Sequence, residues 1–388
     1  MKLVFISNYF NHHQKPISDS FFSILGADYS FIETARMSQE RINLGWADIE
    51  VPEYVRYYYE NESQMKKCQE LIDSADVIII GSAPEFLLKK ALKSRRIIFR
   101  YSERPIKNRS KYWLKYIIRF FKWHNQNRHT QKTYLLCASA FSAYDYSKFF
   151  LFKGKAYKWG YFPFTYHYNE VKALIDSKKK KSILWVARMI DLKHPEHAIQ
   201  VAKRLRDDGF SFQMNLIGNG EKTQEIKELI SSYSLDDNVH LLGAVKQSEV
   251  RGYMEESEIF LFTSNHNEGW GAVLNEAMNS ACAVVANARI GSAPFLVQHQ
   301  QNGLLYDEND IDALYESTKL LLENDHFRKQ LAQNAYNTII FRWNAEQAAK
   351  NFLSLAQDII DGKNNASFSC DQVCSRASVI DDKWFAKR

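Results

Sequence analysis

The sequence contains no apolar run that reaches the roughly 18 residues needed to cross a membrane. Cysteine is scarce as well, with five residues in 388, and the odd number argues against a disulfide framework. No signal peptide precedes the first predicted strand, which begins at Lys2. These absences predict a protein of the reducing cytoplasm that does not span a bilayer.

Three motifs are also missing. Cys370 and Cys374 have no second Cys or His pair nearby, so we interpret them as tail thiols rather than half of a metal site. No Asp-x-Asp stands at a strand end, so no bound metal or other cofactor is expected. The glycine turn at Gly218 and Gly220 lacks the third glycine of a dinucleotide fingerprint, because Thr223 occupies that position. An NAD-dependent oxidoreductase is therefore not expected.

Acidic residues are absent from one long segment, between Arg104 and Lys132. From Tyr112 onward its apolar residues recur at three- and four-residue spacing, which predicts a helix with cations on its flanks. A basic aromatic helix suits an anionic lipid surface, so we predict peripheral binding to the inner face of the cell membrane. The alternative is a core helix with a solvated basic rim. No nucleic-acid-binding motif accompanies the charge, so nucleic acid is not an expected partner. The cations are Arg104, Lys107, Arg109, Lys111, Lys115, Arg119, Lys122, Arg128 and Lys132.

What the chain does contain predicts the α/β fold class. Its 388 residues are 45% hydrophobic and can bury two separate cores. Short apolar runs alternate with helical patterns in both halves, which predicts two doubly wound, Rossmann-like domains. The expected strands cover residues 3–7, 76–81, 96–101 and 134–139 in the first half, and 182–187, 212–218, 239–243, 259–264 and 283–287 in the second.

The domain boundary is expected near residue 163, ahead of the four lysines at 178–181, which we interpret as a solvated linker. An N-terminal acceptor-binding domain would cover 1–163, completed by a C-terminal helix at about 344–361, and a nucleotide-sugar-binding domain would cover 164–343. The polar residues 362–388 are expected to form a flexible tail. Parallel sheets bind ligands outside the carboxyl ends of their strands, so two facing sheets predict a site in a central cleft.

The most informative segment runs from residue 265 to 287, between two expected strands. A helix is expected to open near Gly271, and the glycines Gly269 and Gly271 on either side of Trp270 would let an anion approach its exposed amides. Glu268 precedes this helix and Glu276 lies about two turns along it. A loop carboxylate can accept hydrogen bonds from sugar hydroxyls, while a helix carboxylate accepts them from a ribose. Taken alone, two such glutamates would be interpreted as surface ion-pair residues.

Two cations change that interpretation. Arg188 and Lys193 lie in the loop after the strand at 182–187, at the same carboxyl edge as the acidic segment. They could neutralise a diphosphate and stabilise its charge as it leaves. The glycine turn of Gly218 and Gly220 would lie near the same nucleotide. Together these residues predict one site for a nucleotide sugar.

In these residues the second half resembles the family 4 retaining glycosyltransferases, which have the two-domain GT-B fold. The likeness rests on Arg188 and Lys193, on the turn from Gly218 to Glu221, and on the spacing of Glu268 and Glu276, and it covers roughly residues 182–355. The chain departs from the family after Gly291 and Ser292, because Phe295 stands where members often have a glutamate. By resemblance, the helix after Trp343 would cross back to the first domain.

The resemblance implies an activity. The protein would transfer a sugar with retention and without a metal, from a nucleotide-sugar donor, with UDP-sugar favoured, to a lipid-linked or other glycan acceptor of surface polysaccharide biosynthesis. Arg188 and Lys193 would stabilise the diphosphate, Glu268 would position the sugar, and Glu276 would hold the ribose. A catalytically silent sugar-nucleotide-binding partner subunit and a sugar-nucleotide epimerase are the alternatives.

The first half resembles the family only in outline. His12 and His13 follow its first strand, and Glu103 and Arg104 follow the strand at 96–101, so all four are expected at the carboxyl edge of the first sheet. They are candidates for binding the acceptor or a phosphate. Ordinary surface positions are the alternative.

Overall fold

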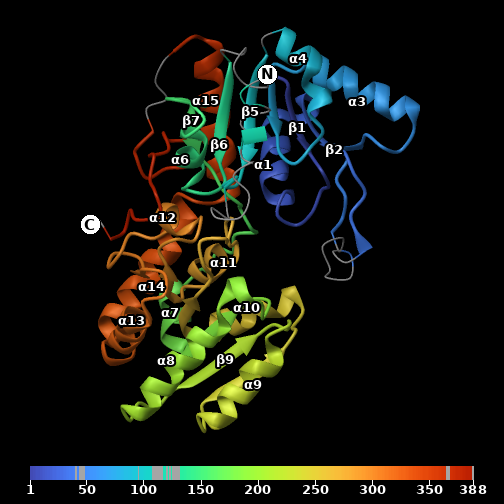
Figure 1. Ribbon diagram of the computed structural model, residues 1–388. Helices are drawn as coiled ribbons and strands as arrows, with labels where there is room; N and C mark the ends of the chain where they lie inside the picture. The colour runs from blue at the N-terminus through green and yellow to red at the C-terminus, as the bar shows by residue number, and fades with distance from the viewer. Residues whose placement is uncertain are drawn as a thin grey trace. The chain divides into compact units, whose positions relative to one another are not determined.

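The computed structural model describes residues 1–39, 42, 49–94, 96–106, 117, 118, 121, 124, 132–363 and 368–386. The chain divides into two compact units (Figure 1). The first contains 1–164 and 344–381, and the second contains 165–343 and the last residues from 382. Helices and strands alternate in both, as the sequence predicts for the α/β class.

A parallel sheet forms the centre of the first unit, with strand order β3-β2-β1-β4-β5-β6-β7. Every residue of β1 and β4 is buried, as expected for strands covered by helices on both faces. The strands are β1 (Leu3–Ser7), β2 (Tyr29–Glu33), β3 (Val55–Tyr57), β4 (Val77–Ile80), β5 (Ile97–Ser102), β6 (Thr133–Cys137) and β7 (Ala156–Lys158). The helices are α1 (Lys15–Leu25), α3 (Glu62–Ser74), α4 (Lys89–Lys93), α6 (Ser142–Ser147) and α15 (Ala345–Ile360), with 3-10 turns at Gly26–Asp28 and Glu85–Leu88.

The helix α15 belongs to the first unit, although it follows the second in sequence. It packs on α1, and the Phe352 ring lies 4.8 Å from Phe99, 5.4 Å from Phe21 and 5.7 Å from Trp159, centroid to centroid. Asn344 caps the helix by accepting a hydrogen bond from the Gln347 amide. The buried aromatic contacts explain why the C-terminal helix returns to the first sheet.

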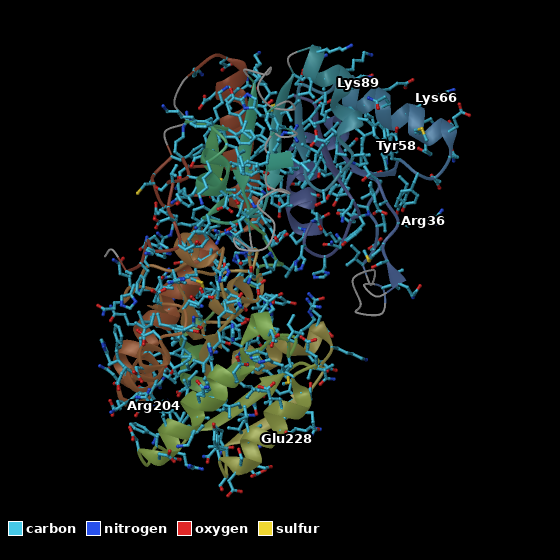
Figure 2. The ribbon with its side chains drawn as sticks, in the orientation of Figure 1. Arg36, Tyr58, Lys66, Lys89, Arg204 and Glu228 are labelled. Carbon is cyan, nitrogen blue, oxygen red and sulfur yellow. The ribbon has the colours of Figure 1, made fainter. Side chains whose placement is uncertain are left out.

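The second unit has a six-stranded parallel sheet with strand order β10-β9-β8-β11-β12-β13. Its strands are β8 (Lys179–Val186), β9 (Gln213–Ile217), β10 (Val239–Gly243), β11 (Ser257–Phe262), β12 (Ala283–Asn287) and β13 (Leu304–Tyr306). Its helices are α7 (Val171–Ser177), α8 (Pro195–Asp207), α9 (Thr223–Ser232), α10 (Gln247–Glu256), α11 (Val273–Asn279), α12 (Ala293–Leu296), α13 (Ile311–Glu323) and α14 (Asp325–Phe341), with a 3-10 turn at Asp191–Lys193. Charged side chains such as Lys66 of α3 and Glu228 of α9 cover the exposed helix faces (Figure 2). Among the described helices, none is both long and apolar enough to cross a membrane.

Each sheet has one point at which the strand order reverses. In the first unit it lies between β1 and β4, and in the second between β8 and β11. The loops that leave two such strands run in opposite directions, which opens a crevice at the carboxyl edge. Sheet topology therefore singles out one candidate ligand position in each unit.

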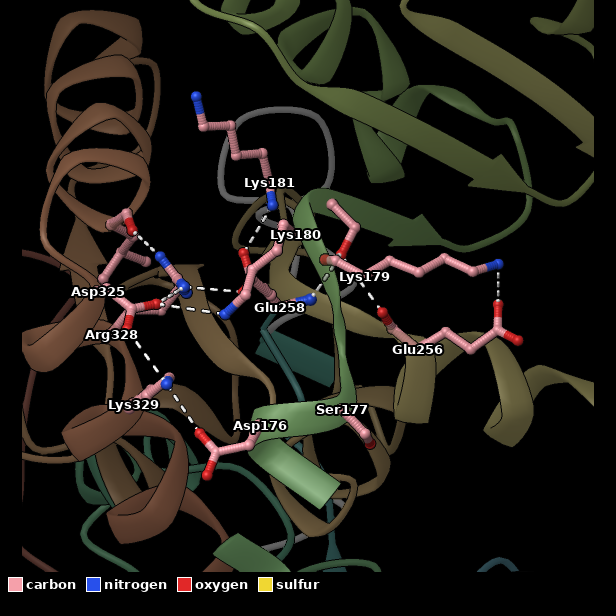
Figure 3. A network of polar contacts seen from close by, with 12 residues as sticks. Asp176, Ser177, Lys179, Lys180, Lys181, Glu256, Glu258, Asp325, Arg328 and Lys329 are labelled. Atoms are coloured by element: carbon pink, nitrogen blue, oxygen red, sulfur yellow. Dashed lines mark hydrogen bonds and ion pairs between the residues drawn. The ribbon is translucent and has the colours of Figure 1, made fainter. Parts of the chain in front are cut away.

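The lysines at 178–181 do not form a linker, contrary to the sequence-based interpretation, although Lys179, Lys180 and Lys181 are exposed as expected. Lys178 is 4% exposed, and its ammonium donates to the carbonyls of Met254, Glu255 and Ser280 at 2.8–3.1 Å. The next three residues begin β8, and Figure 3 shows how they meet acidic partners. The pairing uses Glu256 and Glu258, which are distant in sequence.

A buried ion pair anchors this network. Arg328 donates to Glu258 at 2.8 Å, and the two side chains are 6% and 3% exposed. Replacing Glu258 with glutamine is expected to lower the free energy of unfolding by about 2 kcal/mol, because a buried cation loses its charged acceptor. Asp325→Asn is the matched control, since Asp325 also pairs with Arg328 but is 55% exposed. Urea unfolding of both variants checks this, and equal losses of stability would contradict it.

The segment beyond residue 362 is packed where the structure describes it, so the expected flexible tail is not found at 368–386. Val373 and Cys374 are fully buried, and residues 374–377 exchange backbone hydrogen bonds with β7 at 2.8–3.0 Å. Farther on, the Trp384 indole donates to the Ala288 carbonyl at 2.8 Å. Backbone pairing to an edge strand and burial of Trp384 give this polar segment an ordered place. Cys370 is exposed and Cys374 is buried.

Candidate functional site

The reversal point of the second sheet brings the loops after β8 and β11 together. The Asn265 amide donates to the Leu192 carbonyl at 2.9 Å, and the Thr263 hydroxyl donates to the Lys193 carbonyl at 2.7 Å. Thr263 in turn accepts from the buried Trp185 indole at 2.8 Å. These bonds fix the backbone of Lys193 relative to the start of the acidic segment.

Lys193 and Glu268 form an ion pair at this point. Their side chains are only 14% and 13% exposed, so solvent screens the pair weakly. The two residues are 75 positions apart in sequence, and the structure brings them together. A bound diphosphate would compete with Glu268 for the ammonium of Lys193.

Arg188 lies two residues beyond the end of β8 and is exposed. Within the described part of the chain, no hydrogen bond or ion pair to its guanidinium is found. A guanidinium that is not committed to a carboxylate can bind a phosphate in a bidentate manner. Arg188 is therefore available to a ligand at this edge.

Gly218 and Gly220 have a structural reason to be glycine. A Cβ atom on Gly218 would lie 1.8 Å from the carbonyl oxygen of Ala187, and one on Gly220 would lie 2.2 Å from that of Met189. Gly218 also has a φ of +134°. The close approach that these glycines permit is between the loop after β9 and the loop that carries Arg188, so they shape the site through its backbone.

The acidic segment begins its helix slightly later than expected. α11 starts at Val273, and Gly271 has a φ of +83° and lies against the ring of Phe262. Gly269 and Trp270 are buried, and the Trp270 indole donates to Asn275 at 2.9 Å. Trp270 is thus a core residue rather than an exposed ligand contact.

An aromatic cluster occupies the place where the sequence departs from the pattern of the family that it resembles. Trp270 packs against Trp343 and Phe295, with ring centroids 5.8 and 6.3 Å apart, and Phe295 stacks on Trp343 at 5.7 Å. A glutamate in place of Phe295 would face two indole rings. The departure therefore fits the apolar packing of this loop.

Glu276 is half-buried on α11, and no hydrogen bond to its carboxyl group is found among the described residues. Burial raises the pKa of Glu276 to about 7, and the positive charge of Arg251 opposes the rise only in part. A desolvated carboxyl group without a protein partner is typical of a ligand site.

The raised pKa of Glu276 predicts how the free energy of unfolding changes with pH. The folded protein keeps a proton on Glu276 that the unfolded chain loses near pH 4.5, so ionisation costs folding free energy as the pH rises from 4.5 to about 7. Glu276→Gln is expected to raise the free energy of unfolding by about 3 kcal/mol at pH 8 and to leave it unchanged near pH 4.5. Urea unfolding at both values checks this, with Glu225→Gln on α9 as the control. A destabilised variant at pH 8 would contradict it.

His194 supports the loop between Lys193 and α8. Its backbone is left-handed, with φ of 47°, and its ring nitrogens meet Glu196 at 2.7 Å and Asn265 at 3.1 Å. Glu196 in turn pairs with Lys222 at 3.1 Å. The ring thus ties together the loops that follow β8, β9 and β11.

Three side chains at the start of α8 and just before it meet the distance requirement of a metal site. Ligand atoms of His194, Glu196 and His197 lie within 4.8 Å of one another. However, the two imidazole rings are stacked 4.5 Å apart with an angle of 10° between their planes. A metal ion lies in the plane of each imidazole that binds it, so one ion cannot bind both rings in this arrangement. The geometry fits loop support better than metal binding.

The first unit gathers a second set of side chains at its own carboxyl edge. The rings of His12 and His13 lie 4.0 Å apart, His13 stacks on Tyr161 at 5.4 Å, and the Tyr161 hydroxyl donates to Glu103 at 2.8 Å. We call these four residues the edge cluster. Three of its members are expected from the sequence, whereas Tyr161, which follows the short strand β7, is not.

Arg104 does not join the edge cluster. Its side chain is 1% exposed and forms a double hydrogen bond at 3.2 Å with Asp145, which is fully buried on α6. The ion pair fixes the start of the segment after β5. Most of the basic segment between Arg104 and Lys132 lies outside the described residues, including the expected cations from 107 to 128.

The second unit matches a known protein family. Residues 169–338 match the model of the family described as "Glycosyl transferases group 1". The whole chain resembles HepE from Anabaena, solved in complex with UDP, with a TM-score of 0.66 and 16% sequence identity. That likeness covers 93% of this chain and 99% of HepE. The chain has the GT-B fold.

The curated relatives of this GT-B chain include glycosyltransferases. The amylovoran biosynthesis glycosyltransferase AmsK of Erwinia amylovora is 34% identical over 137 residues, which are 34% of this chain and 33% of AmsK. A Campylobacter jejuni enzyme, named as an N-acetylgalactosaminyltransferase that acts on a diphospho-undecaprenol-linked sugar, is 32% identical over 165 residues, which are 42% of this chain and 44% of that enzyme. The chain thus matches less than half the length of either relative.

Proposed function

We propose that the chain is a glycosyltransferase that moves a sugar from a nucleotide-sugar donor to a glycan acceptor in surface polysaccharide biosynthesis. The observation that carries this proposal is the ion pair of Lys193 and Glu268, which joins the loops after β8 and β11 at the reversal point of the second sheet. Arg188 lies in the same loop as Lys193, and Glu276 lies on α11, the helix that follows Glu268. A UDP-sugar is the favoured donor, and the presence of UDP in HepE supports that choice.

The proposed reaction retains the configuration of the sugar. The bond between the anomeric carbon and the diphosphate oxygen breaks with its electron pair on the diphosphate, and the acceptor oxygen bonds to the same face of that carbon. The leaving phosphate takes the proton of the acceptor hydroxyl. Arg188 and Lys193 stabilise the negative charge that develops on the leaving group. In this mechanism no metal is required, and transfer is expected to persist in chelator.

The two glutamates have separate proposed roles. Glu268, once Lys193 turns to the diphosphate, accepts hydrogen bonds from hydroxyls of the transferred sugar. Glu276 accepts the ribose hydroxyls in its ionised form, and ribose binding offsets part of the cost of ionising a buried carboxyl group. Donor affinity is therefore expected to rise as the pH increases through about 7.

We also propose that the enzyme binds the inner face of the cell membrane from the cytoplasm. The charge of the segment between Arg104 and Lys132 supports this, and Ile118 and Phe121 within it are 69% and 66% exposed. Sedimentation with phosphatidylglycerol vesicles tests it, with phosphatidylcholine vesicles as the control. Equal binding to the two would contradict an electrostatic contribution.

The function is tested with the purified chain, a panel of UDP-, GDP- and ADP-sugars, and a membrane lipid extract, with products detected by mass spectrometry. Turnover of one donor that is lost in Arg188→Ala and Glu268→Ala, but kept in Lys203→Ala, is the expected result. No turnover of any donor would favour a catalytically silent sugar-nucleotide-binding subunit. Interconversion of donors without an acceptor would identify an epimerase.

A further inference from the structure

The loop between α6 and β7 presents an aromatic ring to solvent. Phe150 is 84% exposed, which makes it the most exposed large apolar side chain of the described residues. The residues before and after it, Phe149 and Leu151, are buried. One outward ring thus stands between two side chains that fix the loop to the core. We call residues 148–155 the Phe150 loop.

Two bulky residues of the Phe150 loop have a left-handed backbone. Phe150 has a φ of 57° and Phe152 has a φ of 55°. This conformation is unfavourable for aromatic residues and persists where surrounding contacts enforce it. The Phe150 amide donates to the Ser147 carbonyl at 2.9 Å, and the Lys155 amide donates to the Phe152 carbonyl at 2.9 Å. The Phe152 ring packs edge-on against Tyr146. The fold therefore holds the Phe150 ring outward at a conformational cost, which a role at the surface would explain.

The charge around the exposed ring is positive. Residues 146–169 contain four lysines and no aspartate or glutamate. Two of these lysines, Lys148 and Lys153, are exposed on either side of the ring, and no ion pair to either is found in the described part of the chain. The nearest acidic residue in sequence, Asp145, is buried in its ion pair with Arg104. The Phe150 loop therefore favours a partner of negative charge.

The position of the Phe150 loop connects it with the basic segment. It precedes β7, so it lies at the amino edge of the sheet, opposite the edge where ligands of such sheets bind. The neighbouring strand β6 (Figure 1) is entered from Lys132, the exposed cation that ends the basic segment. The Leu135 amide of β6 donates to the Lys155 carbonyl at 2.9 Å. The loop and the end of the basic segment thus adjoin on one edge.

An anionic bilayer surface combines the two properties that this loop would recognise. Aromatic rings are favourable at the boundary between lipid headgroups and acyl chains, and lysine ammonium groups bind the anionic headgroups there. We propose that the Phe150 loop inserts its exposed ring into the interface of an anionic membrane, with Lys148 and Lys153 against the lipid phosphates. This gives the membrane binding proposed above a second, preformed contact. The inference rests on that proposal for its partner, and it does not depend on sugar transfer.

One substitution separates lipid binding from a structural role of the ring. Asparagine tolerates a left-handed backbone better than phenylalanine does, so Phe150→Asn is expected to raise the urea midpoint of unfolding. The same variant should sediment with phosphatidylglycerol vesicles about tenfold more weakly, because an apolar ring no longer enters the interface. A lowered midpoint with unchanged vesicle binding would assign the ring to folding and overturn the proposal. Phe341→Ser is the control, since Phe341 is 67% exposed at the end of α14 and should bind as the wild type.

The lysines are tested in the same assay. Lys148→Gln and Lys153→Gln are each expected to weaken binding to phosphatidylglycerol vesicles about fivefold. Lys66→Gln is the matched control, because Lys66 is exposed on α3 in the same unit and pairs with Glu62. Equal losses in all three variants would show a general effect of net charge and would refute a specific contact by this loop.

Insertion of the ring is measured directly with a fluorescent label. Cys370 is exposed and the other four cysteines are buried, so Cys370→Ser leaves the surface free for a label at Phe150→Cys. An environment-sensitive dye there is expected to shift to shorter wavelength with phosphatidylglycerol vesicles, whereas the same dye at Phe341→Cys is not. No shift at position 150 would refute insertion. A wild-type dimer that Phe150→Asn abolishes, with no response to vesicles, would instead assign the ring to contact between two copies of the chain.

Donor turnover distinguishes failure of this inference from failure of the proposed function. The loop lies at the edge opposite the candidate ligand position, so Phe150→Asn is expected to leave the donor KM and nucleoside diphosphate release in solution unchanged. Vesicle binding that depends on Phe150, without turnover of any donor, would reject the transferase and keep the loop contact. Normal turnover with vesicle binding that is unaffected by Phe150→Asn would reject the loop contact and keep the transferase.

Discussion

Lys193→Ala is expected to lower kcat for sugar transfer about 10²–10³-fold. The substitution removes a cation that the proposed mechanism places beside the departing diphosphate. It also leaves Glu268, 13% exposed, with a negative charge that would repel the same diphosphate. Both effects raise the energy of the transition state, because charge accumulates on the phosphate oxygens as the sugar leaves.

Steady-state kinetics with a saturating donor measure this loss, and a second substitution sharpens it. In Lys193→Ala combined with Glu268→Gln, the repulsion is gone, so part of the lost rate should return. Lys203→Ala is the matched control, because Lys203 pairs with Asp207 on an exposed face of α8. A wild-type kcat in Lys193→Ala would remove this residue from the mechanism. If the effects of the two substitutions on the activation free energy simply add, the ion pair has no role beyond that of its separate charges.

Arg104→Met is expected to lower the free energy of unfolding by about 3–5 kcal/mol. Methionine keeps the aliphatic volume of arginine but leaves the carboxylate of Asp145 buried without its cation. Burial already raises the pKa of Asp145, although the positive charge of Arg104 lowers it in part. Without that charge, the variant should become more stable as acid protonates the Asp145 carboxyl group. The loss should therefore be largest near neutral pH.

Urea unfolding across pH 5 to 8 measures this effect. Arg36→Met is the control, because Arg36 is exposed and lies over the Tyr59 ring, where a substitution should cost under about 1 kcal/mol. The result also decides between two roles for Arg104. Wild-type stability together with a raised acceptor KM would mean that Arg104 contacts the acceptor after all.

Most buried strands of the second unit could be predicted because their sequences are continuous apolar runs. β11 and β12 are fully buried, and the loops that follow such strands must lie at one sheet edge. The meeting of Lys193 with Glu268 follows from that rule. Three strands of the first unit, β2, β3 and β7, were missed, since β3 and β7 have three residues each and β2 contains Ser30 and Glu33.

Polar residues with distant partners could not be interpreted from sequence. Glu33 is buried because it accepts hydrogen bonds from the Phe10 amide at 2.7 Å and from the Tyr59 hydroxyl at 2.5 Å. Lys178 is buried because it donates to carbonyls more than 70 residues away. In each case the local pattern indicates a solvated side chain, and only the tertiary partner makes burial favourable.

The discontinuous first unit sets an order for folding during synthesis. The second unit is almost one unbroken stretch, residues 165–343, and can fold as soon as it leaves the ribosome. The first unit emerges earlier but lacks α15, so the aromatic surface around Phe21, Phe99 and Trp159 stays uncovered until Phe352 arrives. At about 5–20 residues per second, that wait lasts on the order of ten seconds or more. A nascent chain that stalls before residue 344 would thus expose the aromatic surface of an incomplete first unit to chaperones, while its second unit is already folded.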